Sequence, residues 1–261
     1  MPFLSFTIID ILSEMIGSML YYSHNWRVNA IEENLKSVGA ENFRTRMIFV
    51  NMAKNHFELL KLYRMSNKKL KEITEIDAFI QLEQYKKNTF VLTGHFGNWE
   101  VAPNYVSVAG MKACTIAEFK NVGEKMYRIL ELFRGRYGMI VYPLEDSSTI
   151  LKLRDRYNEG YTPFLLIDRD ITKTGIPVKA GSRILMIPKG PFFMAKKFGS
   201  RIVIGAFVRN NSKKYRFRIV LKDLGKTDSV ETGAQKSINS LLEMIRMYPE
   251  QWFAFDLNWE K

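Results

Sequence analysis

The chain has 261 residues, of which 46% are hydrophobic, and it carries a formal net charge of +12 at pH 7. This size and apolar content fit one large folded domain, or a domain with a helical appendage. The excess of basic residues points to an anionic partner, which can be a membrane surface, a nucleic acid or a phosphorylated ligand. The single cysteine, Cys114, excludes an intrachain disulfide and fits a reducing compartment. Because it lies in an apolar run, we expect a buried strand thiol rather than a nucleophile.

Residues 1–70 are predicted to form an N-terminal helical cap. The apolar segment from Phe3 to Tyr22 contains Asp10 and Glu14, and one charged side chain costs about 2.5–3.5 kcal/mol at the centre of a bilayer. We therefore expect no membrane-spanning helix here, and no secretion signal, since a basic leader and a cleavage site are not apparent. The apolar face of this segment can lie in a membrane interface or pack on the core, and both interpretations stay open. The periodicity predicts helices over 3–22, 26–38 and 41–64.

Residues 71–261 show apolar strands alternating with helical patterns. Such alternation predicts an α/β fold, with a mostly parallel central sheet flanked by helices on both faces. The last two strands are expected to form a hairpin around Asn210-Asn211-Ser212. The predicted strands lie at 89–93, 112–117, 139–142, 162–167, 201–208 and 214–221. The predicted helices lie near 98–109, 122–136, 147–157, 189–198 and 229–247.

The string Thr-Gly-His-Phe-Gly-Asn-Trp-Glu at 93–100 follows directly after a predicted strand. A helix advances about 100° per residue, so His95 and Glu100 cannot cooperate from within one helix. We expect His95 in a turn and Glu100 at the start of the next helix, where it can accept from one imidazole nitrogen and leave the other as a base. Backbone amides near Phe96 to Asn98, including those of Gly97 and Asn98, can stabilise an oxyanion. The alternative is a turn histidine followed by an ordinary helix-start carboxylate.

A second polar group ends the strand predicted at 162–167, a position where parallel sheets present functional side chains. Asp168 and Asp170 can form a structural ion pair or a cap with Arg169, or Asp168 can support His95 or the acceptor. No metal site is predicted, because His95 lacks a second histidine four residues later. No phosphate loop or dinucleotide fingerprint is present, and no nucleic-acid module accompanies the basic residues.

The string at 94–100 resembles that of the lipid A biosynthesis acyltransferases, the late lauroyl/myristoyl transferases within the wider glycerolipid acyltransferase group. The likeness covers most of the chain, because further segments resemble family segments in the family's order. These segments are Arg27–Leu35, Arg134–Gly138, Phe164–Asp170, Pro188–Pro191, Ser200–Ile204 and Tyr248–Trp252.

Several positions depart from the family pattern. Where the family has an arginine and a proline in its second block, this chain has Glu118-Phe119-Lys120, and Lys120 is predicted to replace the missing cation. Arg169 takes the middle position of the family's Asp-Gln-Asp. The segments at 179–181 and 256–258 also differ, reading Lys-Ala-Gly for Phe-Phe-Gly and Asp-Leu-Asn for His-Arg-Arg. These changes bear on the identity of the donor and the acceptor rather than on the reaction class.

The resemblance implies a glycerolipid-acyltransferase-like fold for 71–261 and transfer of a fatty acyl group from a thioester to a hydroxyl of a lipid A precursor or similar membrane glycolipid. His95 would be the general base, Glu100 its orienting acid, and Lys120 or Arg169 an oxyanion or substrate contact. The implied partners are acyl carrier protein or acyl-CoA as the donor, the glycolipid acceptor, and an anionic lipid surface at the cytoplasmic face of the inner membrane, with peripheral attachment. No cofactor and no nucleic acid is expected.

Three alternatives to this function stay open. The acceptor can be a lysophospholipid or glycerol phosphate, or it can be a mannosylated glycolipid in a cell without lipid A. The departures in the second block and near the carboxyl terminus also leave room for a non-catalytic protein that binds membranes peripherally. A nucleic-acid binder is the least favoured interpretation of the charge.

Overall fold

The computed structural model describes residues 4–23, 26–76, 82–120, 123–136 and 138–260. Its centre is a seven-stranded sheet with the strand order β1-β9-β8-β2-β5-β3-β4. The neighbours β8, β2, β5, β3 and β4 run parallel, β9 is antiparallel to β8, and β1 is parallel to β9. The predicted α/β class with a mostly parallel sheet is therefore confirmed. The strands are β1 (Thr74–Ile76), β2 (Thr89–Thr93), β3 (Ala113–Ala117), β4 (Ile140–Pro143), β5 (Thr162–Leu166), β8 (Arg201–Arg209) and β9 (Phe217–Gly225).

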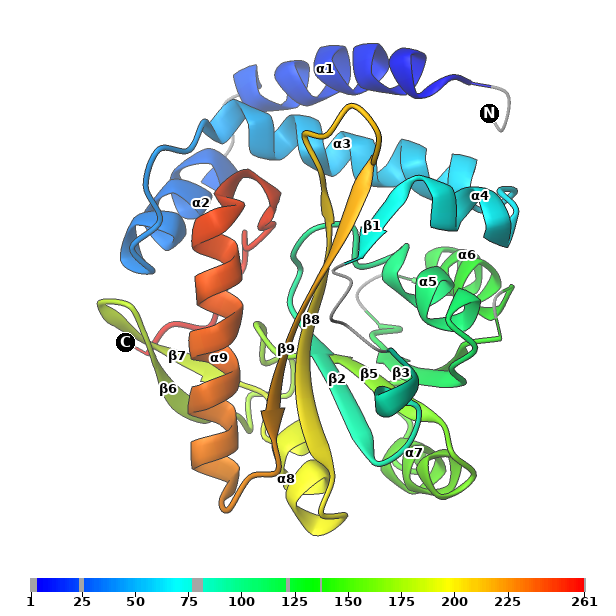
Figure 1. Ribbon diagram of the computed structural model, residues 1–261. Coiled ribbons are helices and arrows are strands. Elements are labelled where there is room, and N and C mark those ends of the chain that lie inside the picture. Colours follow the sequence, from blue (N-terminus) through cyan, green and yellow to red (C-terminus); the bar gives the residue numbers. More distant parts are fainter. Residues whose placement is uncertain (1–3, 24–25, 77–81, 121–122, 137, 261) are drawn as a thin grey trace.

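Helices surround the sheet, and an N-terminal helical region lies across one end of it (Figure 1). The expected helices are confirmed with ends that differ by a few residues, while the short helix α4 was not predicted. The helices are α1 (Phe6–Tyr22), α2 (Trp26–Ser37), α3 (Thr45–Leu62), α4 (Asn67–Glu72), α5 (Ala102–Val108), α6 (Glu124–Gly135), α7 (Thr149–Asn158), α8 (Gly190–Lys197) and α9 (Val230–Met247), with 3₁₀ turns at η1 (Leu82–Tyr85) and η2 (Pro249–Gln251).

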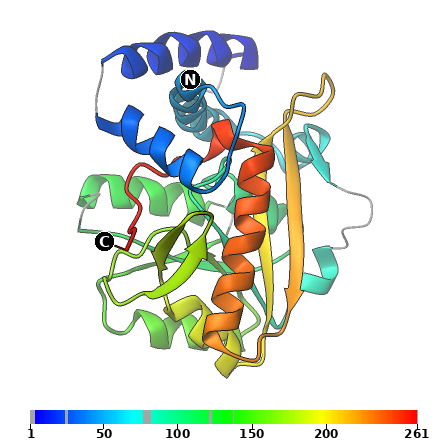
Figure 2. The ribbon, with the colours of Figure 1, turned by 90° about the vertical axis from the view of Figure 1, so that its left-hand side faces the viewer.

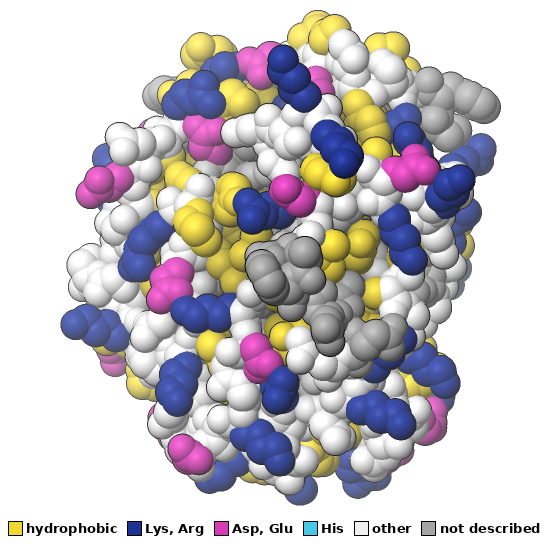
Figure 3. Space-filling model, viewed as in Figure 1, with side chains coloured by type: hydrophobic (Ala, Val, Ile, Leu, Met, Phe, Trp, Pro, Cys, Tyr) yellow, Lys and Arg dark blue, Asp and Glu magenta, His cyan; other side chains and the backbone are white. Residues whose placement is uncertain are grey.

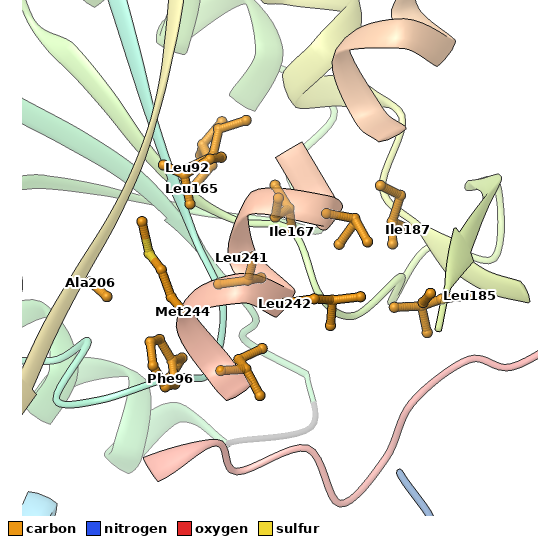
Figure 4. Close-up of a cluster of buried hydrophobic side chains, with 14 of the residues drawn as sticks. Leu92, Phe96, Leu165, Ile167, Leu185, Ile187, Ala206, Leu241, Leu242 and Met244 are labelled. Carbon is orange, nitrogen blue, oxygen red and sulfur yellow. The ribbon is translucent and has the colours of Figure 1, made fainter. Parts of the chain in front are cut away.

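Strand β2 explains why the sheet must be covered on both faces. All five of its residues are buried, and alternate side chains of a strand point to opposite faces. Phe90 and Leu92 pack in the cluster formed with α9 and α8, whereas Val91 packs in the cluster that includes α5. Figure 4 shows Leu241 and Met244 of α9 in the first cluster with Leu92. The sheet is therefore the middle layer of a three-layer protein.

The hairpin between β8 and β9 is confirmed, but β9 begins three residues later than predicted. Asn210 donates its amide to Arg216 O at 2.9 Å, and Ser212 Oγ accepts the amide of Lys214 at 3.1 Å. These bonds close a loop that includes the first residues of the strand predicted at 214–221. The strand therefore starts at Phe217, which is fully buried.

A second hairpin, β6 (Ile176–Ala180) and β7 (Arg183–Ile187), was not predicted and stands apart from the main sheet. It lies beside α9 (Figure 2), where Gln235 exchanges two hydrogen bonds of 2.9 Å with the backbone of Lys179. Its turn contains Gly181 at φ +67°, and an added Cβ would lie 2.1 Å from Ser37 O at the end of α2. Glycine is required there because no side chain fits.

Helix α1 packs one face on α3 and exposes the other. At Gly17 an added Cβ would lie 2.4 Å from Val50 Cα, so the two helices cross at close range. The opposite face is apolar and solvent-exposed, with Met15 65% and Met19 66% exposed. The other exposed apolar residues of this surface are Ile8, Ile11, Ile16 and Tyr22, and together with Met15 and Met19 they are here called the α1 stripe. Within the described residues no helix has the length and apolarity needed to cross a membrane.

Lys and Arg side chains are scattered over the face shown in Figure 3 rather than gathered into one basic patch. The net charge is therefore not concentrated on this face in the way that a nucleic-acid footprint requires.

Candidate active site

The site forms where two neighbouring parallel strands end. Strands β2 and β5 pair in a register that sets Thr93 beside Leu166, and Ile167 donates its amide to Thr93 O at 2.8 Å. The residues that follow these strands therefore emerge side by side at the carboxyl edge of the sheet, where open α/β sheets carry their ligand sites. His95 follows β2 and Asp168 follows β5.

His95 and Asp168 form a pair. The imidazole Nδ1 lies 2.9 Å from Asp168 Oδ1, and the His95 amide donates to Oδ2 at 2.8 Å. The Trp252 indole donates to the same Oδ2 at 3.1 Å. An ionised carboxylate only accepts hydrogen bonds, so Nδ1 carries the proton and Nε2 is left as the basic nitrogen. The His95 side chain is 28% exposed and the Asp168 side chain is 1% exposed. The carboxylate is therefore shielded from solvent, whereas the imidazole can be reached from outside.

The charge state of Asp168 is fixed by these contacts. Burial alone would raise the pKa of its carboxyl. The positive charge that the His95 imidazole carries when protonated, together with the hydrogen bonds from His95 and Trp252, outweighs burial and holds this pKa below its usual value. Asp168 is therefore an anion that can orient the imidazole and stabilise its protonated form.

Gly94 makes the close approach of the two strand ends possible. An added Cβ at this position would lie 2.7 Å from Asp168 Oδ2 and 3.0 Å from Leu241 Cδ2. Any side chain there would push the carboxylate away from the His95 amide. Glycine is therefore required before His95, because the Asp168 carboxylate lies where a side chain would be.

Glu100 does not fill the place that the sequence predicts. Arg134 of α6 holds it through two bonds, Nε to Oε2 at 2.9 Å and Nη2 to Oε1 at 2.7 Å. Such a bidentate fork occupies both carboxylate oxygens. The expected hydrogen bond from the His95 imidazole to Glu100 is therefore wrong. The acid beside the imidazole is Asp168, a role that the sequence had left open for that residue.

Gly97 and Asn98 are also directed elsewhere than expected. The Gly97 amide donates to Gln251 O at 2.8 Å, and the Asn98 amide donates to Phe207 O at 2.6 Å. The Asn98 side chain is fully buried and donates to Glu58 Oε2 at 3.0 Å. These amides are satisfied inside the protein, so the predicted oxyanion contact through them is corrected. The two residues instead belong to the His95 turn (residues 94–98), which Gly97 closes with φ +65°.

A cavity of about 470 Å³ lies beside His95. Its wall is mostly apolar, with polar groups at His95, the Glu100–Arg134 pair and Arg169. For Arg169 the described part of the chain contains no ion-pair partner within 4.0 Å. The apolar lining residues are Trp99, Ile116, Ala117, Leu144, Ile150, Leu165, Leu166, Ile171, Pro188, Pro191 and Met194, and the other polar ones are Glu118, Asp170, Thr172, Thr174 and Lys189.

Of the remaining predicted residues, Lys120 and Cys114 lie apart from this cavity, whereas Asp170 lines it. Lys120 is at the surface beyond β3, where its amide donates to Glu145 Oε1 at 2.7 Å, and it does not line the described cavity. Asp170 accepts from the amides of Thr172 and Gly175 and so shapes its own loop. Cys114 is fully buried in β3, and burial raises the pKa of its thiol to about 12, which confirms the expectation of an inert strand thiol.

Two contacts of the site were missed from the sequence. Trp252 and Arg134 both lie in segments that carry the family resemblance, but nothing in their spacing from His95 indicates what they touch. Trp252 reaches Asp168 from 84 residues away, and Arg134 reaches Glu100 from 34 residues away. Among the described residues no group of three or more His, Cys, Asp or Glu side chains is arranged to hold a metal ion.

The fold and the site define an α/β protein with a histidine–aspartate pair at the carboxyl edge of its sheet and a largely apolar cavity beside the exposed imidazole. The family model described as bacterial lipid A biosynthesis acyltransferase matches residues 1–261, and the chain belongs to this family of acyltransferases. A comparison with curated proteins gives no significant match.

Proposed function

We propose that the protein transfers a fatty acyl group from an acyl thioester to a hydroxyl of a lipid A precursor or similar membrane glycolipid, with His95 as the general base. The observation that carries this proposal is the His95–Asp168 pair at the mouth of the apolar cavity. An acyltransferase of this type needs a base within hydrogen-bonding reach of the reacting oxygen. Nε2 is the imidazole nitrogen that can act as this base.

The chemistry follows from these two side chains. Nε2 of His95 takes the hydroxyl proton while the oxygen bonds to the thioester carbonyl carbon. Asp168 keeps Nδ1 protonated and stabilises the imidazolium that forms. The tetrahedral intermediate then breaks its carbon–sulfur bond, and the imidazolium returns the proton to sulfur. The products are an ester and a free thiol, and no covalent acyl-enzyme is needed.

The apolar wall of the cavity is the proposed place of the acyl chain, because apolar surface gains about 25 cal/mol for each Å² that leaves water. The donor is acyl carrier protein or acyl-CoA, and neither requires a further cofactor. Arg169 lines the same cavity next to Asp168 in the chain. We propose that it binds an anionic group of the acceptor or of the donor, since an unpaired cation beside apolar surface is costly to desolvate.

Replacing Arg169 with glutamine is expected to raise KM for one of the two substrates about 10-fold or more and to leave kcat little changed, as expected when a hydrogen bond to a charged group is lost from ground and transition state alike. Steady-state kinetics with donor and acceptor varied in turn measure this. Lys213→Gln removes the same charge from the β8–β9 loop and should have no effect. An unchanged KM for both substrates in Arg169→Gln would remove Arg169 from the proposed site.

We also propose that the α1 stripe attaches the protein peripherally to the cytoplasmic face of the inner membrane. Its apolar side chains point away from α3 and toward solvent, which is the arrangement of a helix that lies in a membrane interface. The positive net charge favours anionic lipid headgroups. Strands β8 and β2 are parallel, so both end on the same side of the sheet, and His95 follows β2. Helix α1 lies beyond α3 on that side (Figure 1).

The double substitution Met15→Glu with Met19→Glu is expected to weaken binding to anionic vesicles by about 10-fold or more, since burial of one methionine is worth about 1.5–3 kcal/mol. Co-sedimentation with vesicles at fixed ionic strength measures it. Met247→Glu changes a methionine that is 61% exposed at the end of α9 and is the matched control. Equal sedimentation of the double variant and the wild type would contradict attachment through α1.

Mass spectrometry of lipids from cells with and without the gene tests the acceptor. The proposal predicts a glycolipid of the lipid A type that is heavier by one acyl group only when the gene is present. A change confined to phospholipids, or to a mannosylated glycolipid, would replace the proposed acceptor by that one. An unchanged lipid profile together with vesicle binding would favour a non-catalytic membrane protein.

A further inference from the structure

A fully buried carboxylate, Glu58 of α3, lies behind the His95 turn. It accepts from the Arg209 guanidinium at 3.2 and 2.8 Å and from the Arg216 guanidinium at 3.0 and 2.7 Å. Asn98 donates its side-chain amide to the same carboxylate at 3.0 Å. Its side chain is 0% exposed, and a buried charge persists only where it is paired and hydrogen-bonded in this way. Glu58 thus joins α3, both ends of the β8–β9 loop and the His95 turn.

A second side chain of the same helix face holds the turn from the other side. Asn55 lies three residues before Glu58, so the two point in similar directions from α3. Asn55 donates to Gly97 O at 2.9 Å and accepts from Arg209. The turn is therefore bound to α3 at two consecutive residues, Gly97 and Asn98. These residues lie two and three positions after His95, the proposed base.

The network extends outward from the turn to α1. Arg216 binds both oxygens of Asp10 at 2.7 Å while it also binds Glu58. Lys54 adds a contact of 3.1 Å to Asp10. Burial alone would raise the pKa of Asp10, but Arg216 and Lys54 outweigh burial and hold it below the usual value, so this end of the network is also ionised.

Stability alone is a poor explanation for such an arrangement. Apolar side chains of similar volume commonly replace a buried ion pair at no cost to stability, or with a gain. The network even leaves Asn98 Oδ1 without a hydrogen-bond partner among the described residues, which is unfavourable for a buried oxygen. What the polar network provides and an apolar one does not is a fixed direction for the turn, set by bonds to particular atoms.

We infer that Glu58 is a positioning residue for the reaction, which acts through Asn98 to hold the His95 turn in its reactive geometry. This inference rests on the proposed function, because it assumes that His95 is the base. Glu58 is not among the residues that line the cavity and is not expected to contact substrate. Its loss should therefore lower kcat and leave KM for donor and acceptor little changed.

The test is a double-mutant cycle on kcat with Glu58→Gln and Asn98→Ala. A displacement of catalytic groups by about 1 Å can cost about 10²-fold, so each single variant is expected to lower kcat by about 10- to 100-fold. The double variant should be little worse than either single one, because both act through the same hydrogen bond. All rates are taken below the unfolding temperature of each variant and expressed for the folded fraction.

Leu70→Ala is the control for stability. Leu70 is 1% exposed in α4 and does not line the cavity, so its truncation destabilises the fold without touching the turn. It should retain the wild-type kcat per folded molecule. Wild-type kcat in folded Glu58→Gln and Asn98→Ala, or losses that add in the double variant, would overturn the inference. Failure of the wild type to transfer acyl groups at all would instead overturn the proposed function.

Discussion

Replacing His95 with alanine is expected to lower kcat/KM for acyl transfer by about 10²- to 10⁴-fold, the usual contribution of a general base. Two other carboxylates of the described lining are engaged elsewhere, since Glu100 is bound through both oxygens to Arg134 and Asp170 accepts from the amides of its own loop. The release of free thiol from an acyl thioester in the presence of acceptor measures the rate.

A matched control is available in the same protein. His56 lies on α3 and is solvent-exposed, so His56→Ala removes the same side chain away from the cavity and should keep full activity. Thiol release at the wild-type rate by the His95 variant would mean that another group takes the proton, and the mechanism would be wrong.

The second large effect is expected for Asp168→Asn, with a loss in kcat of about 10²- to 10⁴-fold, comparable to the loss of the base itself. Three donors converge on this carboxylate: the His95 amide and the Trp252 indole reach Oδ2, and Nδ1–H reaches Oδ1. In the amide variant the remaining oxygen serves the two donors on the Oδ2 side, so the amide NH₂ faces Nδ1. The imidazole must then carry its proton on Nε2, and a protonated Nε2 cannot accept the hydroxyl proton.

Glu100→Gln distinguishes this assignment from the spacing-based prediction. It leaves the His95–Asp168 pair intact, so kcat should stay close to the wild-type value. The free energy of unfolding should fall by about 1–3 kcal/mol, because Arg134, only 8% exposed, loses its charged partner. Stability comes from denaturant titration and kcat from thiol release. A large loss of kcat in Glu100→Gln with full activity in Asp168→Asn would reverse the roles of the two acids.

The position of His95 at a strand end was predictable from the sequence, but the sequence did not decide between Glu100 and Asp168 as its acid partner. The string around His95 lies next to a strand that periodicity identifies, so the histidine could be placed at a strand end. Which carboxylate it meets depends on strand order, because β5 lies beside β2 although β3 and β4 come between them in the chain. A separation of five residues made Glu100 the natural candidate, while Asp168 lies 73 residues away.

The same limit explains the other differences. The backbone amides of the turn were expected to face the substrate, but Phe207 O and Gln251 O, from distant segments, accept two of them. The hairpin of β6 and β7 was missed because its strands pair only with each other, outside the main sheet, and rest on α9, which is distant in the chain. For α1 the packing interpretation is confirmed, since Ile9, Ser13 and Gly17 are buried, while the exposed Met15 and Met19 keep attachment to a membrane interface as a proposal.

Two glycines of the His95 turn, Gly94 and Gly97, have a packing role that the sequence alone does not reveal. A glycine commonly lets the chain bend or lets a ligand approach the backbone closely. In the structure the close neighbours are protein atoms: the Asp168 carboxylate at Gly94 and Phe207 O at Gly97. The glycines therefore allow the turn to pack against β5 and β8 rather than against a ligand. Their replacement would disturb the position of His95 before it disturbed binding.

The most direct test follows the acceptor itself in a purified reaction. Wild type, the His95→Ala variant and the His56→Ala control are incubated with an acyl thioester and a lipid A precursor. The mass of the intact lipid is followed over time by mass spectrometry. The account predicts that the lipid gains the mass of one acyl group with the wild type and the control, and scarcely at all with the His95 variant. Equal gain in all three reactions, or no gain with the wild type, would contradict it.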